Sequence, residues 1–458
     1  MDERRLLTRA AELAADWVES SPERPIPPGA TIVELREALG GPLPDSGSPD
    51  LDVIEQLVRD GESGLTAMGS GRYFGFVIGG TLPAALAADW LVSAWDQNAG
   101  LLLLSPTAAV VEETAGTWVK ELLGLPATAS FAFVTGCQMA HTTALAVARD
   151  AVLERAGWSV GEQGLQGGPR LRIVTGEKRH VTVDRALRLL GLGSGQVRLV
   201  PVDDQGRMRA ALLPDVLAET NGPTIVVAQA GEVNTGSFED FHAIADACEA
   251  RGAWLHLDGA FGLWACASDE LRHLVDGAER ADSWATDAHK WLNVPYDCGI
   301  ALCADPAAHR RSMSAAASYL VQVDESEGRE PLAYGPEFSR RARSVPVYAA
   351  IRALGRTGVG ELVDRCCRHA RAFAEQIAPL PGAEVLNEVV LNQVLFRFAA
   401  DATTSAALAA VQAGGEAWMS GTTWDGRPAI RLSVSGWRTT EDDVVRTVAA
   451  FVRALGRG

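Results

Sequence analysis

The chain has no long uninterrupted apolar run. Its most apolar stretch, residues 82–104, is broken by Asp89, Asp96 and Asn98, which argues against a membrane span. Residues 1–25 carry Asp, Glu and Arg among their apolar positions, so this segment lacks the apolar centre of a signal peptide and instead predicts an amphipathic helix. We therefore expect a soluble, cytoplasmic protein with no membrane partner.

Paired cysteines and basic clusters are also missing. The seven cysteines are an odd number scattered between Cys137 and Cys367 with no CxxC spacing, which argues against a disulfide framework and against a structural zinc site. We expect reduced thiols and no metal. Lys and Arg total 41 against 58 for Asp and Glu, so the formal net charge is −17 and the composition argues against a nucleic-acid partner.

Length and apolar content indicate more than one domain. With 458 residues, 47% of them hydrophobic, the chain can form a large core and is too long for one ordinary domain. Residues 1–70 predict helices joined by Pro- and Gly-rich connectors, with too little apolar surface for a core of their own, so we expect them to pack on a partner subunit. Residues 71–343 predict a large α/β domain, and residues 344–458 predict a small C-terminal α+β domain.

The large domain is predicted to hold a mostly parallel seven-stranded sheet with helices on both faces. Short β-rich runs alternate with helical periods, such as 140–157 and 239–252, which is typical of parallel strands joined by crossover helices. The predicted strands span residues 130–136, 171–177, 196–203, 224–232, 253–262, 282–290 and 299–305. Polar residues gather where several of these strands end, which is the edge where α/β sheets bind ligands.

Lys290 follows one of these strands, in the sequence Thr-Asp-Ala-His-Lys-Trp. A lone lysine at a strand end is more often a solvated surface group than a nucleophile. Its neighbours here are mostly uncharged or aromatic, and we expect them to desolvate the ammonium and lower its pKa, as Schiff-base chemistry requires. Lys290 is therefore a candidate for covalent attachment of a cofactor.

Asp258 ends another apolar run, whose alternation is expected to bury it. A buried carboxylate must be paired or hydrogen-bonded. One interpretation is an N-cap for the segment that follows. The other is a partner for a cationic ring nitrogen, because pyridoxal 5′-phosphate (PLP) withdraws electrons well only while its pyridinium nitrogen stays protonated. The small residues Gly259 and Ala260 would leave room beside it for a flat ring.

Two further strand ends carry candidate binding residues. The turn 134–140, Val-Thr-Gly-Cys-Gln-Met-Ala, joins a strand to a helix, and such turns offer backbone N–H groups and the helix dipole to a phosphate. Many turns of this kind bind nothing, and this one has a single glycine. His180 also follows a strand, where a histidine is more often structural than catalytic.

In this order, the phosphate turn, the histidine, the buried aspartate and the lysine resemble the fold-type I PLP enzymes, and more narrowly the group II amino-acid decarboxylases. That group includes the aromatic amino-acid, histidine and glutamate decarboxylases. The resemblance covers residues 70–440. Its motifs are RYFGF (72–76), ELLGLP (121–126), AGEVNTGSFED (230–240), WLHLDGAF (254–261), ADSWATDAHKW (281–291), YDCG (296–299) and SRRARSVPVYAAIRALGRTG (339–358). Together these motifs are highly specific.

The resemblance implies a role for each candidate. Lys290 would form the Schiff base with PLP, Asp258 would pair with the pyridinium nitrogen, and His180 and Ala260 would lie on the two faces of the ring. The phosphate would be held by Thr135, Gly136, Cys137, Gln138 and His289. Tyr319 matches the tyrosine that protonates the substrate carbon in aromatic amino-acid decarboxylases, although a buried linker tyrosine is an equal alternative. The polar, glycine-containing segment 321–335 after it is typical of a mobile lid.

The sequence departs from the family pattern at two places. The phosphate turn usually has a second glycine followed by Glu-Ala-Asn, whereas this chain has Cys137 and then Met139-Ala140-His141. The asparagine usual before the Ala-His-Lys triplet is Asp287 here, and a carboxylate close to a phosphate dianion is repulsive unless it is protonated or turned away. Both departures concern the expected phosphate contacts.

The function implied by the resemblance is decarboxylation of an L-amino acid to the amine and CO2. The alternatives are decarboxylation with oxidation to an aldehyde, transamination, Cα–Cβ lysis, or a PLP-binding homologue without turnover. In this family the pocket walls come from both subunits, so we expect a homodimer with active sites at the interface. Tyr73, Phe74 and Phe76 of the partner would be wall residues, and they favour an aromatic or apolar substrate slightly.

Overall fold

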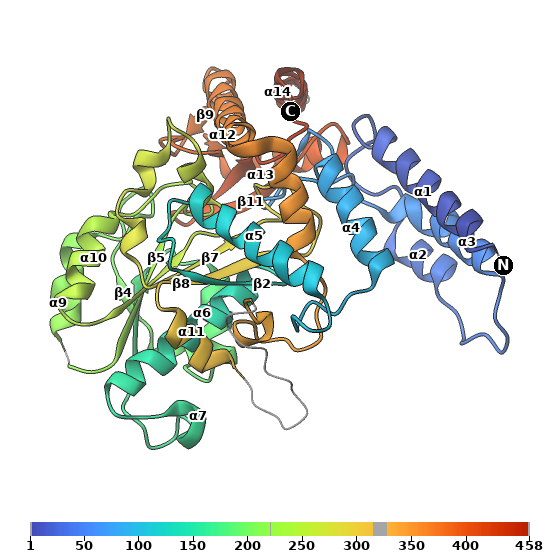
Figure 1. Cartoon of the computed structure of the whole chain (residues 1–458). Coiled ribbons are helices and arrows are strands. Elements are labelled where there is room, and N and C mark those ends of the chain that lie inside the picture. Colours follow the sequence, from blue (N-terminus) through green and yellow to red (C-terminus); the bar gives the residue numbers. More distant parts are fainter. Residues whose placement is uncertain (1, 220, 315–327, 457–458) are drawn as a thin grey trace.

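Two β-sheets and the helices packed around them make up the protein, which is represented by a computed structural model that describes residues 2–219, 221–314 and 328–456 (Figure 1). The larger sheet has seven strands and the smaller has five. Among the described helices, none combines the length and the apolar character needed to cross a membrane.

The seven-stranded sheet confirms every strand predicted from the sequence. Its strands are β2 (Ser130–Val134), β3 (Arg172–Gly176), β4 (Arg198–Val200), β5 (Thr224–Gln229), β6 (Trp254–Asp258), β7 (Ser283–Asp287) and β8 (Gly299–Cys303). They lie in the order β2-β8-β7-β6-β5-β3-β4. Only β8 runs antiparallel to its neighbours, so the sheet is mostly parallel, as predicted.

Both faces of this sheet are buried, which explains its nearly continuous apolar strands. Along β5, Ile225 and Val227 belong to one core cluster, whereas Val226 and Ala228 belong to the other. The first cluster includes side chains from α6 (Cys137–Arg155), α8 (Val181–Leu189) and α11 (Pro306–Met313). The second includes side chains from α5 (Pro106–Leu122), α10 (Phe241–Glu249) and α12 (Ser344–Ile377), so helices cover both faces.

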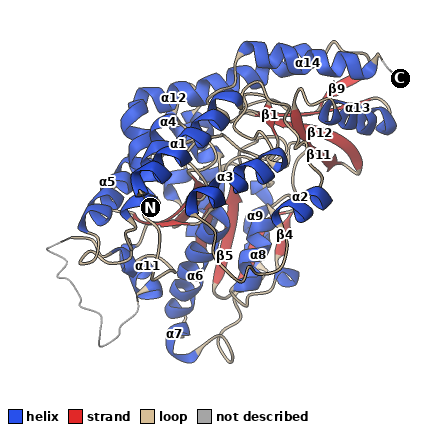
Figure 2. Cartoon of the chain, turned by 90° about the vertical axis from the view of Figure 1, so that its right-hand side faces the viewer, coloured by secondary structure: helices blue, strands red, loops and turns tan. Residues whose placement is uncertain are grey.

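The smaller sheet joins the C-terminal region to a piece of the N-terminal half. Its strands are β1 (Tyr73–Phe74), β9 (Ala383–Val385), β10 (Gln393–Phe398), β11 (Trp418–Trp424) and β12 (Arg427–Ser433), in the order β1-β11-β12-β10-β9. Helices α12, α13 (Asp401–Ala413) and α14 (Glu441–Leu455) accompany it. The predicted α+β character is confirmed, and the sheet lies apart from β4 and β5 in Figure 2. Strands β1 and β11 and helix α13 were not predicted.

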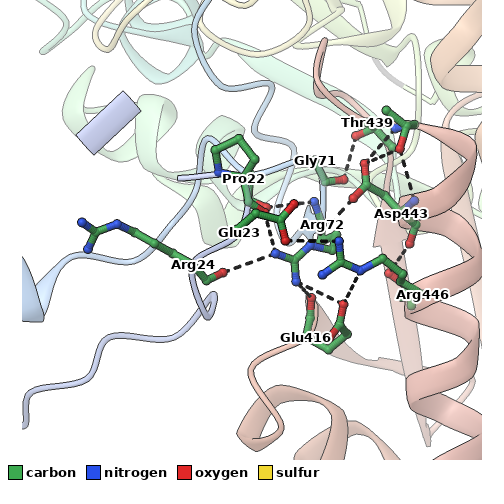
Figure 3. A network of polar contacts seen from close by, with 12 residues as sticks. Pro22, Glu23, Arg24, Gly71, Arg72, Glu416, Thr439, Asp443 and Arg446 are labelled. Atoms are coloured by element: carbon green, nitrogen blue, oxygen red, sulfur yellow. Dashed lines mark hydrogen bonds and ion pairs between the residues drawn. The ribbon is translucent and has the colours of Figure 1, made fainter. Parts of the chain in front are cut away.

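Arg72, immediately before β1, ties these distant segments together (Figure 3). Its guanidinium, 2% exposed, donates to the carbonyl oxygens of Pro22 (2.6 Å) and Glu416 (2.5 Å). Its Nε lies 3.7 Å from the Asp443 carboxylate at the start of α14. One buried cation therefore links the segment after α1, the strand β1, the loop before β11 and the last helix.

The N-terminal helices lie to one side of this body (Figure 1). They are α1 (Glu3–Ser20), α2 (Ile32–Leu39) and α3 (Asp50–Gly61), and none of their residues is buried within the chain. Large apolar side chains such as Ile32, Val53 and Leu57 are exposed on them. The remaining α-helices are α4 (Pro83–Trp95), α7 (Val160–Gln163) and α9 (Leu213–Ala218). The N-terminal helices thus lack a core of their own, as the sequence predicted.

Candidate active site

The candidate residues converge at one edge of the seven-stranded sheet. Gly136 follows β2, His180 is the N-cap of α8 after β3, and Asp258 is the last residue of β6. Asp287 ends β7, and Lys290 comes three residues later. Parallel strands direct their carboxyl ends to the same edge, so residues separated by more than 150 positions in sequence lie together.

Asp258 is a buried carboxylate, 5% exposed. It accepts a hydrogen bond from the Ala260 N–H (3.1 Å), and its Oδ2 lies 3.4 Å from Nε2 of His141. Burial alone raises the pKa of Asp258, but the hydrogen bond of His141, the charges that His141 and His180 carry when protonated, and the charge of Lys290 outweigh it, so the pKa lies well below its usual value. Asp258 is therefore ionised at neutral pH.

Lys290 forms an ion pair with Asp287. Its Nζ lies 3.0 Å from Asp287 Oδ2. Burial lowers the pKa of Lys290, but the charge and hydrogen bond of Asp287 together with the charge of Asp258 and the neighbouring Cys137 oppose it, so the net shift is upward. The prediction of a lowered lysine pKa is therefore wrong for the structure as it stands. The prediction rested on the apolar neighbours of Lys290 and left out the Asp287 carboxylate, which contacts the ammonium.

The Asp287 side chain also contacts the turn that is predicted to hold the phosphate. Its Oδ1 accepts a hydrogen bond from the Cys137 N–H (2.6 Å), the first residue of α6, and lies 3.4 Å from Nε2 of His289. The other nitrogen of His289, Nδ1, accepts from the Cys298 N–H (3.1 Å). The carboxylate is thus not turned away from the turn. It sits where an anion is favoured by the helix dipole and by a backbone N–H.

His180 stands beside these charges. Its Nδ1 lies 2.7 Å from the Thr182 hydroxyl and accepts from the Thr182 N–H (3.4 Å), which caps α8 and fixes the ring. Burial lowers the pKa of His180, and the charge of Asp258 raises it by less than burial and the nearby cations lower it. The imidazole is therefore neutral near pH 7.

Glycines let the segments around the phosphate turn pack closely against each other. A Cβ on Gly136 would lie 3.2 Å from the His289 ring, and a Cβ on Gly299 of β8 would lie 2.5 Å from the Gly136 Cα. Burial raises the pKa of Cys137 well above its usual value, so it carries a thiol and not a thiolate. Thr135 and Gln138 are half-buried, and Gln138 Oε1 is a buried atom without a hydrogen-bond partner among the described residues. Ala260 is half-buried next to Asp258.

Tyr319 and most of the predicted lid lie outside the described residues. The chain is described again from Gly328, and Arg329 then pairs with Glu112 (2.9 Å), which is 1% exposed. Arg340 contacts the same carboxylate at 2.7 Å. The end of segment 321–335 is thus anchored to α5 beside the sheet.

Arg431, on β12 of the smaller sheet, is a candidate site residue that was not predicted from the sequence. It is 7% exposed, donates to the Val233 carbonyl oxygen (3.0 Å), and its Nε has no hydrogen-bond partner among the described residues. Its charge is close enough to lower the pKa of His180. The only signal in the sequence was a charged residue in the middle of the apolar run AIRLSVS.

The three expected wall residues, Tyr73, Phe74 and Phe76, differ in how exposed they are. Phe74 is 0% exposed and packs edge-on against Phe373 (5.0 Å), so its prediction as a pocket wall is wrong. Tyr73 is also buried within its own chain, stacked on Trp418 at 5.2 Å. Phe76 alone is exposed, at 58%. Successive residues of a strand face opposite sides, and both sides of β1 are covered, because Tyr73 packs on Trp418 and Phe74 packs on Phe373.

Comparisons with known proteins identify relatives along almost the whole chain. Residues 34–399 match the family described as the pyridoxal-dependent decarboxylase conserved domain. The chain is 28% identical to the aromatic-L-amino-acid decarboxylase of Bacillus atrophaeus, over 86% of this chain and 81% of that protein. It is also 28% identical to the L-2,4-diaminobutyrate decarboxylase of Rhizobium meliloti, over 90% and 83% of the two chains. The crystal structure of Oryza sativa TDC with PLP and tryptamine is similar with a TM-score of 0.92 and 24% identity, over 100% of this chain and 98% of that one.

The architecture and these relatives define the class as a fold-type I PLP-dependent enzyme. Within that class the family match covers most of the sequence, so the chain belongs to the pyridoxal-dependent decarboxylase family. It is a carboxy-lyase that decarboxylates an L-amino acid with PLP as its cofactor. The resemblance predicted from the sequence motifs is confirmed.

Proposed function

We propose that Lys290 attaches PLP covalently and that Asp258 holds a proton on the ring nitrogen of the cofactor. The observation that carries this proposal is the buried anion Asp258, which lies close enough to Lys290 and His180 to change the pKa of each. A carboxylate that stays ionised when buried is the partner that a pyridinium requires. When bound, PLP supplies an electron sink for the pair released as the bond from Cα to the carboxylate breaks.

The other site residues orient the reactants. His180, neutral and fixed by Thr182, would lie against one face of the ring, with Ala260 on the other side. Thr135, Gly136, Cys137, Gln138 and His289 would surround the phosphate. Arg431 would bind the substrate carboxylate, because a buried guanidinium with a free Nε is matched best by an anion. Tyr319 is proposed as the proton donor to Cα, on the motif alone.

The product decides between decarboxylation to an amine and the related outcomes. We expect a panel of L-amino acids to yield CO2 and the amine in equal amounts, without hydrogen peroxide or keto acid. The curated relatives include aromatic, diaminobutyrate and cysteine sulfinic acid decarboxylases, so side-chain preference depends on the walls and not on the shared core. The exposed Phe76, stacked on Trp418 (5.8 Å), favours aromatic or apolar amino acids. Failure of every amino acid to release CO2 would contradict the proposed function, and peroxide with an aldehyde would indicate the oxidative branch.

We further propose a cytoplasmic homodimer with domains at 1–70, 71–343 and 344–458. The support for a dimer is the group of large apolar side chains exposed on α1, α2 and α3, including Ile32, Val53 and Leu57, which a second copy would cover. All seven cysteines are free thiols, which suits a reducing compartment. Sedimentation of the intact protein is expected to give twice the chain mass. Ile32→Asp together with Leu57→Asp, on exposed positions, should shift it toward the monomer.

Asp287→Asn is expected to strengthen cofactor binding by about tenfold. The wild-type carboxylate faces the turn that would hold the phosphate, where two like charges repel each other. Asparagine can still accept from the Cys137 N–H and can donate to a phosphate oxygen. The dissociation constants for PLP and for inorganic phosphate, measured by fluorescence titration of the cofactor-free protein, should both fall.

Asp297→Asn is the matched control for this substitution. Asp297 is a more exposed carboxylate of the same region that pairs with Arg343 (2.8 Å). Its replacement should leave both dissociation constants unchanged. Weaker phosphate binding by Asp287→Asn would show that Asp287 assists the phosphate, either protonated or through Lys290, and would contradict this interpretation.

A further inference from the structure

A buried chain of polar side chains runs from Asp258 away from the candidate site and into the sheet. His141 Nε2 lies 3.4 Å from Asp258, and its other nitrogen, Nδ1, lies 2.9 Å from Nε2 of His256. His256 Nδ1 lies 2.9 Å from the Ser283 hydroxyl, which accepts from the indole N–H of Trp254 at 2.8 Å. All five side chains are buried, and they come from α6, β6 and β7.

One arrangement of the protons directs every hydrogen bond of the chain toward Asp258. The Trp254 indole is a donor without acceptor capacity, so the Ser283 oxygen accepts from it and the hydroxyl proton is free to point to His256 Nδ1. Burial lowers the pKa of His256 to about 3, so this ring is neutral and carries a single proton. In this arrangement the proton is on Nε2 and faces His141. His141 then accepts at Nδ1 and donates from Nε2 to Asp258. With the protons placed in this way, every donor points toward the carboxylate.

A metal site formed by Cys137, His141 and Asp258 is an alternative interpretation of this cluster. Cys137, His141 and Asp258 present possible ligand atoms within 4.8 Å of one another, and the Cys137 sulfur lies 3.4 Å from His141 Nε2. The burial and the neighbouring carboxylates that raise the thiol pKa oppose the thiolate that a metal requires. His141 Nε2 is moreover already directed at Asp258. The cluster is therefore better explained as hydrogen bonding to the carboxylate than as metal ligation.

We propose that His141 is a positioning residue, and that the chain Trp254–Ser283–His256–His141 fixes the orientation and the charge of Asp258 for the cofactor's ring nitrogen. This proposal rests on the proposed role of Asp258. It assigns a function to His141, which stands where the family pattern has asparagine, and to two residues that do not touch the site. Hydrogen bonds to a charged acceptor are stronger than neutral ones and polarise one another along a chain, so a remote donor affects the carboxylate.

Other ionisable groups also face Asp258 and are part of the prediction. His180 from the start of α8 and Lys290 after β7 both lower its pKa. Glu239, whose own pKa burial raises to about 8, interacts with Asp258 unfavourably when ionised. None of these groups is changed by altering Ser283 or Trp254. A shift seen in such variants is therefore attributable to the chain through His141.

Ser283→Ala and Trp254→Phe test the proposal in the full-length protein. Each removes a donor of the chain without touching Asp258, and Trp254→Phe retains most of the aromatic packing. We expect the PLP dissociation constant at neutral pH to rise about tenfold in Ser283→Ala and less in Trp254→Phe. We also expect the pH below which PLP affinity falls to move up by about one unit, because a less supported Asp258 is protonated at higher pH.

Ser130→Ala is the matched control. Ser130 is a buried serine of the same sheet whose hydroxyl also contacts a histidine, His309, at 2.8 Å, but this pair does not lead to Asp258. Its loss should lower the melting temperature about as much as Ser283→Ala and leave the pH profile of PLP binding unchanged. The proposal is overturned if Ser130→Ala shifts the profile equally, or if Trp254→Phe and Ser283→Ala both bind PLP as the wild type does. Failure of the wild type itself to bind PLP would instead overturn the proposed role of Asp258.

Discussion

Replacing Lys290 by alanine is expected to lower the rate of CO2 release by about four orders of magnitude or more. The substitution removes the amine that would attach the cofactor, and no other lysine can replace it. The sequence contains only three lysines. Lys120 donates to the carbonyl oxygens of Ala127 and Ala129, and the Lys178 ammonium lies 4.5 Å from the centre of the Trp424 ring.

This scarcity of lysine makes the measurement unambiguous. Borohydride reduction of the wild-type protein with PLP, followed by peptide mass analysis, should place one label on Lys290. Lys178→Ala is the control, because Lys178 also lies near a strand end but its ammonium contacts the Trp424 ring. This variant should keep the label on Lys290 and the decarboxylase activity. A label on Lys120 or Lys178, or substantial CO2 release by Lys290→Ala, would contradict the assignment.

The large sheet was predictable because its signal is local. Strands buried on both faces read as short apolar runs, and each observed strand lies within its predicted bounds. Strand β1 was not predictable in this way. It has two residues, and it exists because Tyr73 pairs with Trp418, about 345 positions away. A short segment whose partner is so distant leaves no periodicity in the sequence.

The candidate site was predictable as a set of strand ends, but its electrostatics were not. Strand order brings Gly136, Asp258 and Lys290 to one edge, and their motifs were visible in the sequence. The raised pKa of Lys290 depends on the contact with Asp287, and the depressed pKa of Asp258 depends on His141, which the sequence showed only as a departure from the family pattern. Such shifts arise from distances of 3 to 4 Å between segments, and these distances are fixed by the fold.

Arg72→Ala is expected to lower the free energy of unfolding by about 3–5 kcal/mol. The guanidinium is 2% exposed and satisfies the carbonyl oxygens of Pro22 and Glu416, while Asp443 balances its charge (Figure 3). Alanine would leave two carbonyl oxygens without their donor and the half-buried Asp443 carboxylate without its cationic partner. The loss should appear as a lower urea midpoint, and cleavage by a protease should begin near residues 22–24, which Arg72 holds against α14.

Arg446→Ala separates burial from charge in this prediction. The Glu416 carboxylate lies 3.3 Å from the Arg72 guanidinium and 2.7 Å from Nε of Arg446, whose side chain is 32% exposed (Figure 3). Water can solvate Glu416 when Arg446 is removed, so we expect a loss of about 1 kcal/mol or less. Equal losses in the two variants would mean that the charge on Glu416 decides the effect. A much larger loss for Arg72→Ala would show that burial of the cation, and not the charge on Glu416, decides how strongly it joins the two ends of the chain.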